Sequence, residues 1–214
     1  MTEFKRAHAE DLPMVAACHV AAFPDTMSAK LGVEFVTKTL ECYVHDDNKF
    51  LLFLDSQGEC AGYVSGIFVD ENSGLGSASS MLQSSWGAGL RALLRKPQLL
   101  LDPELREKVP FVVRNLKHRL FGKRGSNHAG APKRPAGYRS VGIPGICVHP
   151  GHRRKGYASK LMLAAEAVGY DAGYRHMHST VAVDNVASAD CHLKLGYRIA
   201  KRDAKTLKME KSLD

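Results

Sequence analysis

Thirteen residues carry the strongest structural signal in the chain: Ile146-Cys147-Val148-His149-Pro150-Gly151-His152-Arg153-Arg154-Lys155-Gly156-Tyr157-Ala158. Before them, apolar residues and glycines between 141 and 148 predict a short strand. After them, the run 160–168 is rich in strong helix formers and predicts a helix. The first turn of a helix leaves backbone N–H groups unpaired and carries partial positive charge. We therefore expect the basic turn to bind a phosphate or, given its width, a pyrophosphate.

The pattern of this turn points to one family of phosphate-binding sites. The chain has no G-x-x-x-x-G-K-[ST], and no G-x-G-x-x-G between a strand and a helix. Instead, Arg153-x-x-Gly156-x-Ala158 resembles the acyl-CoA signature of the GNAT superfamily of acetyltransferases, [QR]-x-x-G-x-[GA]. A second block at a suitable distance resembles that family's later strand end, helix and closing turn: Asp184-Asn185, Ala187-Ser188-Ala189 and Leu195-Gly196-Tyr197. Together the two blocks span residues 141–200.

The resemblance implies the fold class. We expect an α/β (α+β) GNAT fold, in which a central mixed, mostly antiparallel twisted sheet of about seven strands is flanked by helices. The sequence agrees at its beginning, where it predicts strands over 3–8, 49–54 and 60–69. Helices are predicted from Glu10 and from about Leu31 to His45. We treat 1–214 as a single GNAT domain.

The chain departs from the family between residues 70 and 138. The family joins its third and fourth strands by a short turn, whereas about 68 residues intervene here, far more than a hairpin loop needs. We assign 71–137 to a basic helical insertion. One helix is predicted over 79–95, a second is predicted to start at Asp102-Pro103-Glu104, and a Gly/Pro-rich linker is predicted over 122–137.

The positive charge of the chain is concentrated in the same region. The whole chain carries +8, while residues 91–139 hold 13 Lys/Arg and 3 Asp/Glu, which is +10 and leaves −2 for the rest. The charges could be a solvated helix face, or they could line the acceptor pocket and favour an anionic substrate. A third alternative is peripheral membrane contact through a basic amphipathic helix. We expect no nucleic-acid partner, because the basic residues are not interleaved with aromatic ones.

Composition indicates an ordinary soluble globular protein, with 44% hydrophobic and 24% charged residues. No uncharged apolar run reaches the roughly 18–20 residues of a transmembrane helix. The five cysteines are scattered, and we expect buried thiols in a reducing compartment, so the predicted localisation is cytoplasmic. Ten histidines include no H-x-x-x-H or Cys/His cluster, so we expect no metal. The protein is expected to be a monomer or a homodimer.

The resemblance also implies where acetyl-CoA, the acetyl-donor substrate, would bind. Its pyrophosphate would lie on the turn, and Asn185 would contact the cofactor or cap the strand end. Its pantetheine arm would pair with Ile146 and Val148 like an added strand, which requires that the two neighbouring strands splay apart near Pro144-Gly145. A freed N–H near Ile146 or Cys147 could then hold the thioester oxygen. The predicted turn residues are Arg153, Arg154, Lys155, Gly156, Tyr157 and Ala158.

Two histidines are the candidate catalytic residues. The family often has a tyrosine that protonates the leaving thiolate at the eighth residue from Asn185, and this chain has His192 there. Family members often place a basic glutamate on the strand before the turn, but 139–148 contain no carboxylate. His178, on the strand beginning near Arg175, is therefore our candidate general base. Packing roles for both histidines remain open, as does a mechanism through water and positioning alone.

The expected reaction is transfer of an acetyl group to a primary amine of a small molecule. The stretch His19–Val36 loosely resembles GNAT proteins associated with bacterial surface polysaccharides, which implies a phosphate-bearing amino sugar. Its contacts would include Asp25, Glu34 and Tyr43. Two alternatives remain: a protein- or tRNA-linked amine as acceptor, and a non-catalytic acyl-CoA sensor.

Overall fold

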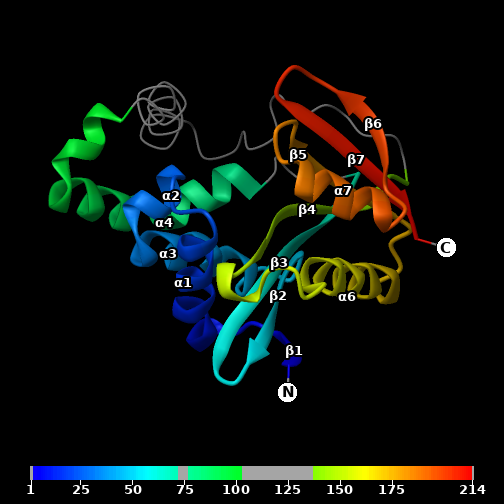
Figure 1. Ribbon diagram of the computed structural model, residues 1–214, viewed down its shortest axis with the longest axis horizontal. Helices are drawn as coiled ribbons and strands as arrows, with labels where there is room; N and C mark the ends of the chain where they lie inside the picture. Colours follow the sequence, from blue (N-terminus) through cyan, green and yellow to red (C-terminus); the bar gives the residue numbers. More distant parts are fainter. Residues whose placement is uncertain (1, 72–76, 103–136, 214) are drawn as a thin grey trace.

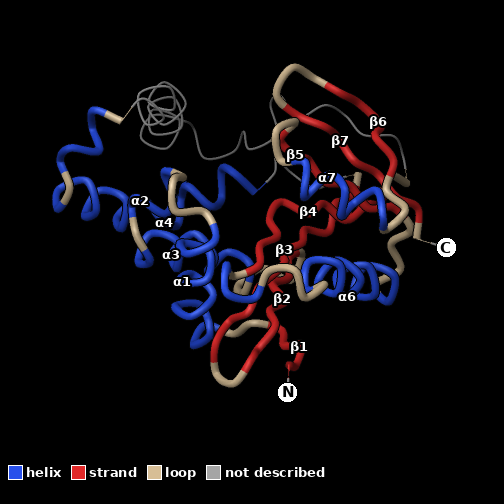
Figure 2. The backbone as a smooth tube through the Cα atoms, in the orientation of Figure 1, coloured by secondary structure: helices blue, strands red, loops and turns tan. Residues whose placement is uncertain are grey.

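The computed structural model describes residues 2–71, 77–102 and 137–213. The second helix and most of the linker predicted within the insertion lie outside these residues. A seven-stranded sheet crosses the molecule in the order β1-β2-β3-β4-β5-β7-β6 (Figures 1 and 2). Only the β4–β5 pair is parallel in this sheet. The strands are β1 (Thr2–Arg6), β2 (Lys49–Ser56), β3 (Glu59–Asp70), β4 (Arg139–Val148), β5 (His176–Ala182), β6 (Arg198–Arg202) and β7 (Thr206–Ser212). The predicted mixed, mostly antiparallel sheet is confirmed.

Helices cover the sheet on two faces (Figure 1). On one face, α6 packs over a core that includes Val141, Ile143 and Met177. On the other face, α1 and α3 pack over a core that includes Tyr63 and Cys147. A strict two-residue period would place Val141, Ile143 and Cys147 on one face of β4. They lie in two separate cores because the strand is irregular between them, where its register with β3 shifts. The helices are α1 (Leu12–Ala22), α2 (Met27–Leu31), α3 (Val33–Leu40), α4 (Ser77–Arg95), α6 (Tyr157–Asp171) and α7 (Val186–Lys194).

The long helix predicted to end near His45 is interrupted. Gly32 has φ +96°, a conformation that favours glycine, and it separates α2 from α3. A 3-10 turn, Glu41–Tyr43, then replaces the last helical turn. The predicted strands 49–54 and 60–69 correspond to β2 and β3, which form an antiparallel hairpin with Gly58 at φ +85° in its turn.

The insertion separates two strands that pair with each other. β3 and β4 are antiparallel neighbours although 68 residues lie between Asp70 and Arg139. The predicted helix 79–95 corresponds to α4, which begins two residues earlier and is followed by a 3-10 turn, Pro97–Leu101. No helix within the described residues is long and apolar enough to span a membrane.

Candidate functional site

The basic turn between β4 and α6 presents backbone N–H groups at the start of a helix. A 3-10 turn, Pro150–His152, follows β4, and Arg154 then adopts φ +62°. Gly156 is the N-cap of α6 with φ +73°, and it has no side chain to cap the helix. The first bond within the helix runs from the Lys160 N–H to the Gly156 carbonyl at 3.1 Å. The N–H groups of residues 157–159 therefore precede the helical hydrogen-bond ladder and can bind an anion.

The three cations of the turn differ in their surroundings. Arg153, Arg154 and Lys155 are all exposed. Arg153 also donates a hydrogen bond from Nη2 to the carbonyl oxygen of Ala22, at 3.0 Å, and so joins the turn to the last residue of α1. Part of the Arg153 guanidinium therefore stabilises the fold, while its positive charge remains beside the N-terminus of α6.

The two parallel strands part next to this turn. β4 and β5 pair only at Val141, Gly142 and Ile143, although β4 continues to Val148. The parting begins at Pro144, which has no N–H to donate. A register shift between Ser65 and Ile67 on β3 lies opposite the same point. The splay predicted near Pro144-Gly145 is thus present, and no described strand pairs with the β5-facing edge of residues 144–148.

His178 projects over β4 just below the point of parting. A Cβ atom added to Gly142 would lie 3.1 Å from His178 Nε2, so the imidazole lies above this glycine. The Ser140 hydroxyl donates to the Tyr138 oxygen at 3.1 Å. Its own oxygen can therefore accept from His178 Nδ1, which is 3.2 Å away. With the proton on Nδ1, Nε2 is the basic nitrogen, and it faces β4.

His192 lies in the core, separate from His178. Its side chain is 1% exposed, and its ring packs edge-on against Tyr197, with centroids 5.1 Å apart. Nδ1 lies 2.7 Å from the Ser188 carbonyl oxygen and must donate to it, because a carbonyl only accepts. Nε2 is buried without a hydrogen-bond partner among the described residues. Burial lowers the pKa of His192. The neutral ring therefore presents a lone pair at Nε2.

Asn185 and the candidate acceptor residues occupy different settings. Asn185 caps α7, where its side-chain oxygen accepts from the Ser188 N–H at 3.1 Å. Asp25 is exposed in the turn after α1. Glu34 pairs with Arg91 at 2.7 Å and with Arg95 at 3.2 Å, so its carboxylate is engaged by α4. Tyr43 is 2% exposed and packs in the core under α1 and α3, away from any ligand arriving directly from solvent.

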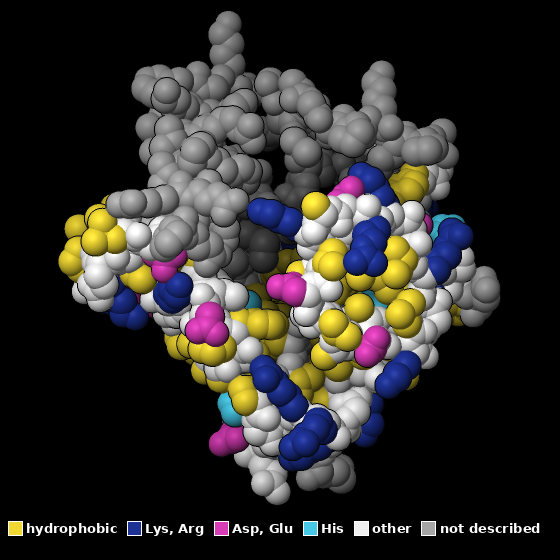
Figure 3. Space-filling model, turned by 45° about the horizontal axis from the view of Figure 1, so that its top comes forward, with side chains coloured by type: hydrophobic (Ala, Val, Ile, Leu, Met, Phe, Trp, Pro, Cys, Tyr) yellow, Lys and Arg dark blue, Asp and Glu magenta, His cyan; other side chains and the backbone are white. Residues whose placement is uncertain are grey.

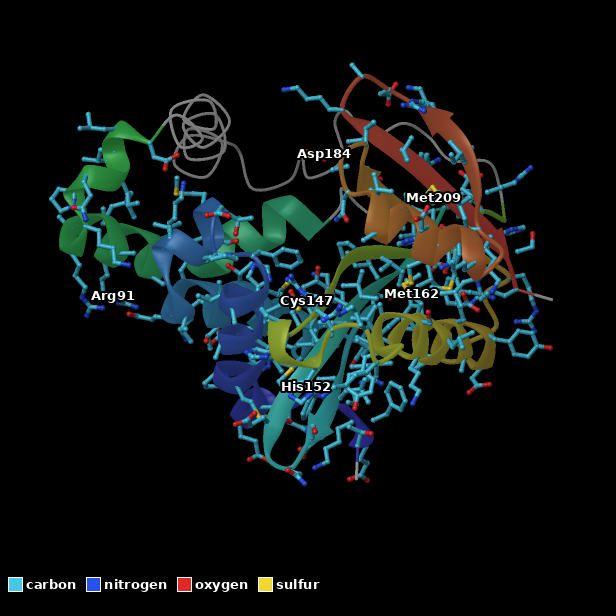
Figure 4. The ribbon with its side chains drawn as sticks, in the orientation of Figure 1. Arg91, Cys147, His152, Met162, Asp184 and Met209 are labelled. Atoms are coloured by element: carbon cyan, nitrogen blue, oxygen red, sulfur yellow. The ribbon has the colours of Figure 1, made fainter. Side chains whose placement is uncertain are left out.

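A group of polar side chains that we did not predict lies beside the parted strand. The Tyr63 hydroxyl on β3 lies 2.7 Å from His19 Nδ1 on α1, and His19 Nε2 lies 3.1 Å from the Ser28 hydroxyl on α2. Tyr63 pairs with Cys147 across β3 and β4. Figure 4 labels Cys147, which lies centrally where α1 faces the sheet. In the sequence His19 is spaced with Leu12, Val15 and Ala16 as on one helix face, but this spacing does not identify its partner on β3.

Figure 3 shows a recess lined by hydrophobic side chains between the two halves of the molecule. The described residues contain no group of three or more His, Cys, Asp or Glu side chains arranged to bind a metal. The candidate site consists of a turn with backbone N–H groups at a helix start, a strand edge beside it that no described strand covers, and histidine and tyrosine side chains on the opposite face of the sheet from α6.

Comparisons with known proteins agree with this geometry. Residues 118–197 match the sequence model of the GNAT acetyltransferase family. No protein with a curated description matches the chain by sequence. Three solved structures share the fold: the PaiA N-acetyltransferase of Thermoplasma acidophilum in complex with coenzyme A, a ribosomal-protein alanine N-acetyltransferase of Escherichia coli, and Arabidopsis thaliana NAA60 in complex with acetyl-CoA.

These likenesses extend over whole chains at low identity. The first is 10% identical with a TM-score of 0.58 and covers 99% of both chains. The second is 13% identical with a TM-score of 0.57, covering 100% of this chain and 95% of the other. The third is 11% identical with a TM-score of 0.58, covering 100% of this chain and 99% of the other. The family match includes the turn, the parted strands and α7, and the fold of the whole chain is the one that these acetyltransferases share.

Proposed function

We propose that the protein transfers an acetyl group from acetyl-CoA to a primary amine by direct attack within a ternary complex. The observation that carries this proposal is the parting of β4 from β5 directly before the basic turn and the N-terminus of α6. Two of the structures with the same fold contain coenzyme A or acetyl-CoA, which supports the choice of donor.

The turn and the strand edge suit different parts of the donor. The pyrophosphate would accept hydrogen bonds from the N–H groups at the start of α6, with Arg153, Arg154 and Lys155 supplying charge. The pantetheine arm would lie along Ile146 and Val148, which have lost their β5 partner. An N–H of Ile146 or Cys147 would stabilise the negative charge that develops on the thioester oxygen.

The acceptor would arrive from the face opposite α6. Because the turn leads into α6, the donor occupies that side, and the other face of β4 carries His178 above Gly142. His178 Nε2 would remove a proton from the incoming ammonium group, giving the free amine that attacks. His192 stays our candidate for proton exchange with the leaving thiolate, and its donation requires a proton on Nε2.

A phosphate-bearing amino sugar remains the acceptor that we favour, with Asp25 as the predicted contact that is exposed. The positive field of the insertion supports it. A macromolecular amine would be favoured instead if the same charges docked an acidic surface. A non-catalytic acyl-CoA sensor is the second candidate function, because β4 lacks a carboxylate and the His192 Nδ1 proton is committed to a carbonyl.

The test is release of CoA thiol from acetyl-CoA over a panel of amines, combined with calorimetric binding of CoA. We expect turnover with at least one amine, and a loss of about a hundredfold in kcat/KM for His178→Gln. Tight CoA binding without turnover on any amine would support the sensor. Full activity of His178→Gln would remove this residue as the base while leaving the reaction in place.

A further inference from the structure

A chain of hydrogen bonds fixes the proton positions around Tyr63. The Thr26 hydroxyl donates to the Phe23 carbonyl at 2.8 Å, so its oxygen can only accept from the Ser28 hydroxyl, 3.1 Å away. The Ser28 oxygen then accepts from His19 Nε2 at 3.1 Å. This places the single proton of neutral His19 on Nε2 and leaves Nδ1 to accept from the Tyr63 hydroxyl at 2.7 Å. The Tyr63 oxygen keeps only lone pairs for any further partner.

These lone pairs lie beside the parted strand. A Cβ atom added to Gly145 would be 3.9 Å from the Tyr63 oxygen and 3.1 Å from the Ser65 hydroxyl oxygen. Ser65 donates its own proton to the Gly145 carbonyl at 3.3 Å, so its oxygen too can accept from a further partner. Both side chains are 3% exposed. Two buried acceptor oxygens above a glycine suit a ligand that donates hydrogen bonds, and an amine is such a ligand.

The position along β4 relates this pair of oxygens to the reaction. Gly145 immediately precedes Ile146 and Cys147, whose N–H groups are the candidate holders of the thioester oxygen. Cys147 belongs to the core under α1 and α3, as does Tyr63, so both lie on the face that we assign to the acceptor. His178 lies lower on the same face, above Gly142. Along β4, Tyr63 therefore lies nearer than His178 to Ile146 and Cys147, the candidate holders of the thioester oxygen.

We propose that the acceptor amine binds above Gly145 with an N–H directed at the Tyr63 oxygen, and that Tyr63 and His19 together take the proton released as the amide bond forms. This inference rests on the proposed function. After His178 has made the free amine, the nitrogen attacks the thioester carbon and becomes positively charged. Tyr63 then accepts one proton from it as the tyrosine's own proton passes to His19 Nδ1.

The remaining steps return every group to its starting state. The tetrahedral intermediate expels the CoA thiolate, and the carbonyl of the amide forms. His19 returns its proton through Tyr63 to the thiolate, which becomes CoA thiol, and His178 releases to solvent the proton that it took from the ammonium group. The net reaction gives the amide, CoA thiol and one proton. Tyr63 is a catalytic residue in this scheme because it contacts the amine, and His19 positions it and holds the proton.

The environment keeps both groups neutral before reaction. Burial raises the pKa of Tyr63 well above its ordinary value and lowers the pKa of His19. A neutral histidine can accept a proton, and a neutral tyrosine can pass one. The titratable groups that face the pair from the neighbouring elements are Cys18 on α1, Tyr43 in the 3-10 turn, Cys60 on β3 and Cys147 on β4.

The experiment compares single-group deletions in the full chain. Tyr63→Phe removes only the hydroxyl, and we expect kcat to fall about a hundredfold, as for other lost proton-transfer groups. His19→Gln can still accept from Tyr63 but cannot take its proton, and we expect a similar fall in kcat with little change in KM. Tyr174→Phe is the matched control, since it removes a buried tyrosine hydroxyl that bonds to Asp70 away from the site. Its activity should equal that of the wild type.

Two further readouts separate catalysis from structure. CoA affinity and the thermal midpoint should stay close to wild type in Tyr63→Phe, because only an oxygen atom is lost. On the acid side of about pH 6.5, the plot of log kcat against pH should be shallower in His19→Gln than in the wild type. The scheme requires two neutral histidines, His178 and His19, and this variant lacks one of them.

Activity of Tyr63→Phe and His19→Gln within twofold of an active wild type would overturn the inference and leave the proposed function standing. A wild-type protein inactive on every amine would remove both.

Discussion

The protonation state of His192 governs what this residue can do. Its Nδ1 proton is committed to the Ser188 carbonyl, and its Nε2 is one of two buried side-chain atoms without a partner in the described part of the chain. The other is Glu166 Oε1, whose second oxygen accepts from Lys211 at 2.7 Å. A histidine held in this way can give a proton from Nε2 only after receiving one. A tyrosine at the same position would carry its proton permanently at neutral pH.

His192 should make the stability of the protein depend on pH. Burial lowers its folded-state pKa below the unfolded value of about 6.5. Between these two pKa values the unfolded chain binds a proton that the folded chain does not, so the free energy of unfolding falls as the pH falls. His19 acts in the same direction. In His192→Asn, whose amide can still donate to Ser188, the loss between pH 7.5 and 5.5 should be smaller, by at most about 1.4 kcal/mol.

Urea unfolding of the two proteins at both pH values measures this difference. The His19 contribution is present in both proteins and cancels in the comparison. Equal pH dependence in wild type and variant would mean that His192 is not held neutral in the folded state.

At the scale of the elements, β4 and the turn after it determine the site. Pro144 and the glycines that flank it were readable from the sequence, because a proline cannot donate to a neighbouring strand and a glycine leaves room beside the backbone. The turn was readable as well, because its small and basic residues are consecutive. The contact of His19 with Tyr63 joins residues 44 positions apart, and it depends on how α1 lies on β3. No spacing rule in either segment encodes that packing.

Arg153 links the turn to α1 and should have two separable roles. Arg153→Glu removes a positive charge beside the α6 N-terminus and also the hydrogen bond to Ala22. We expect CoA affinity to fall at least about tenfold and the free energy of unfolding to fall by about 1 kcal/mol, the usual value of one hydrogen bond. Arg154→Glu is the matched control. It should weaken CoA binding with little loss of stability.

We would measure CoA affinity by calorimetry and the free energy of unfolding by urea titration, for the wild type, Arg153→Glu and Arg154→Glu. Unchanged CoA affinity in Arg153→Glu would contradict the placement of the pyrophosphate on this turn. If Arg153→Glu bound CoA weakly only because it is partly unfolded, its urea unfolding curve would show that loss of structure.

At the scale of the whole molecule, the sheet and its helices followed from the family resemblance, whereas the insertion did not. Its first helix, α4, docks against α3 through Arg91 and Arg95, which flank Glu34. The paired guanidinium groups, chiefly that of Arg91, lower the pKa of Glu34. Figure 4 places Arg91 at the outer side of this helical layer, away from Cys147. Glu34, which we expected to contact the acceptor, thus holds α4 of the insertion in place. The sequence around Glu34 does not show this role, because the role depends on where α4 packs.

The charge of the insertion should determine which acceptors react fastest. Residues 91–139 carry +10 by sequence, and Glu34 offsets only one of these charges. A phosphate-bearing amine is attracted by such a field and a polyamine is repelled by it, and salt screens both effects within about 10 Å at 0.1 M. We therefore expect kcat/KM for nucleotide-linked amino sugars to exceed that for free hexosamines and polyamines at low salt, and to fall several-fold at 0.5 M salt. The kcat/KM of free hexosamines, which carry no phosphate, should change little with salt, and these compounds serve as the control.

Acetylation rates for the three classes of acceptor at both salt concentrations measure the effect. Faster acetylation of polyamines at low salt would contradict this role of the insertion, and strong salt dependence confined to proteins or tRNA would identify a macromolecular acceptor instead.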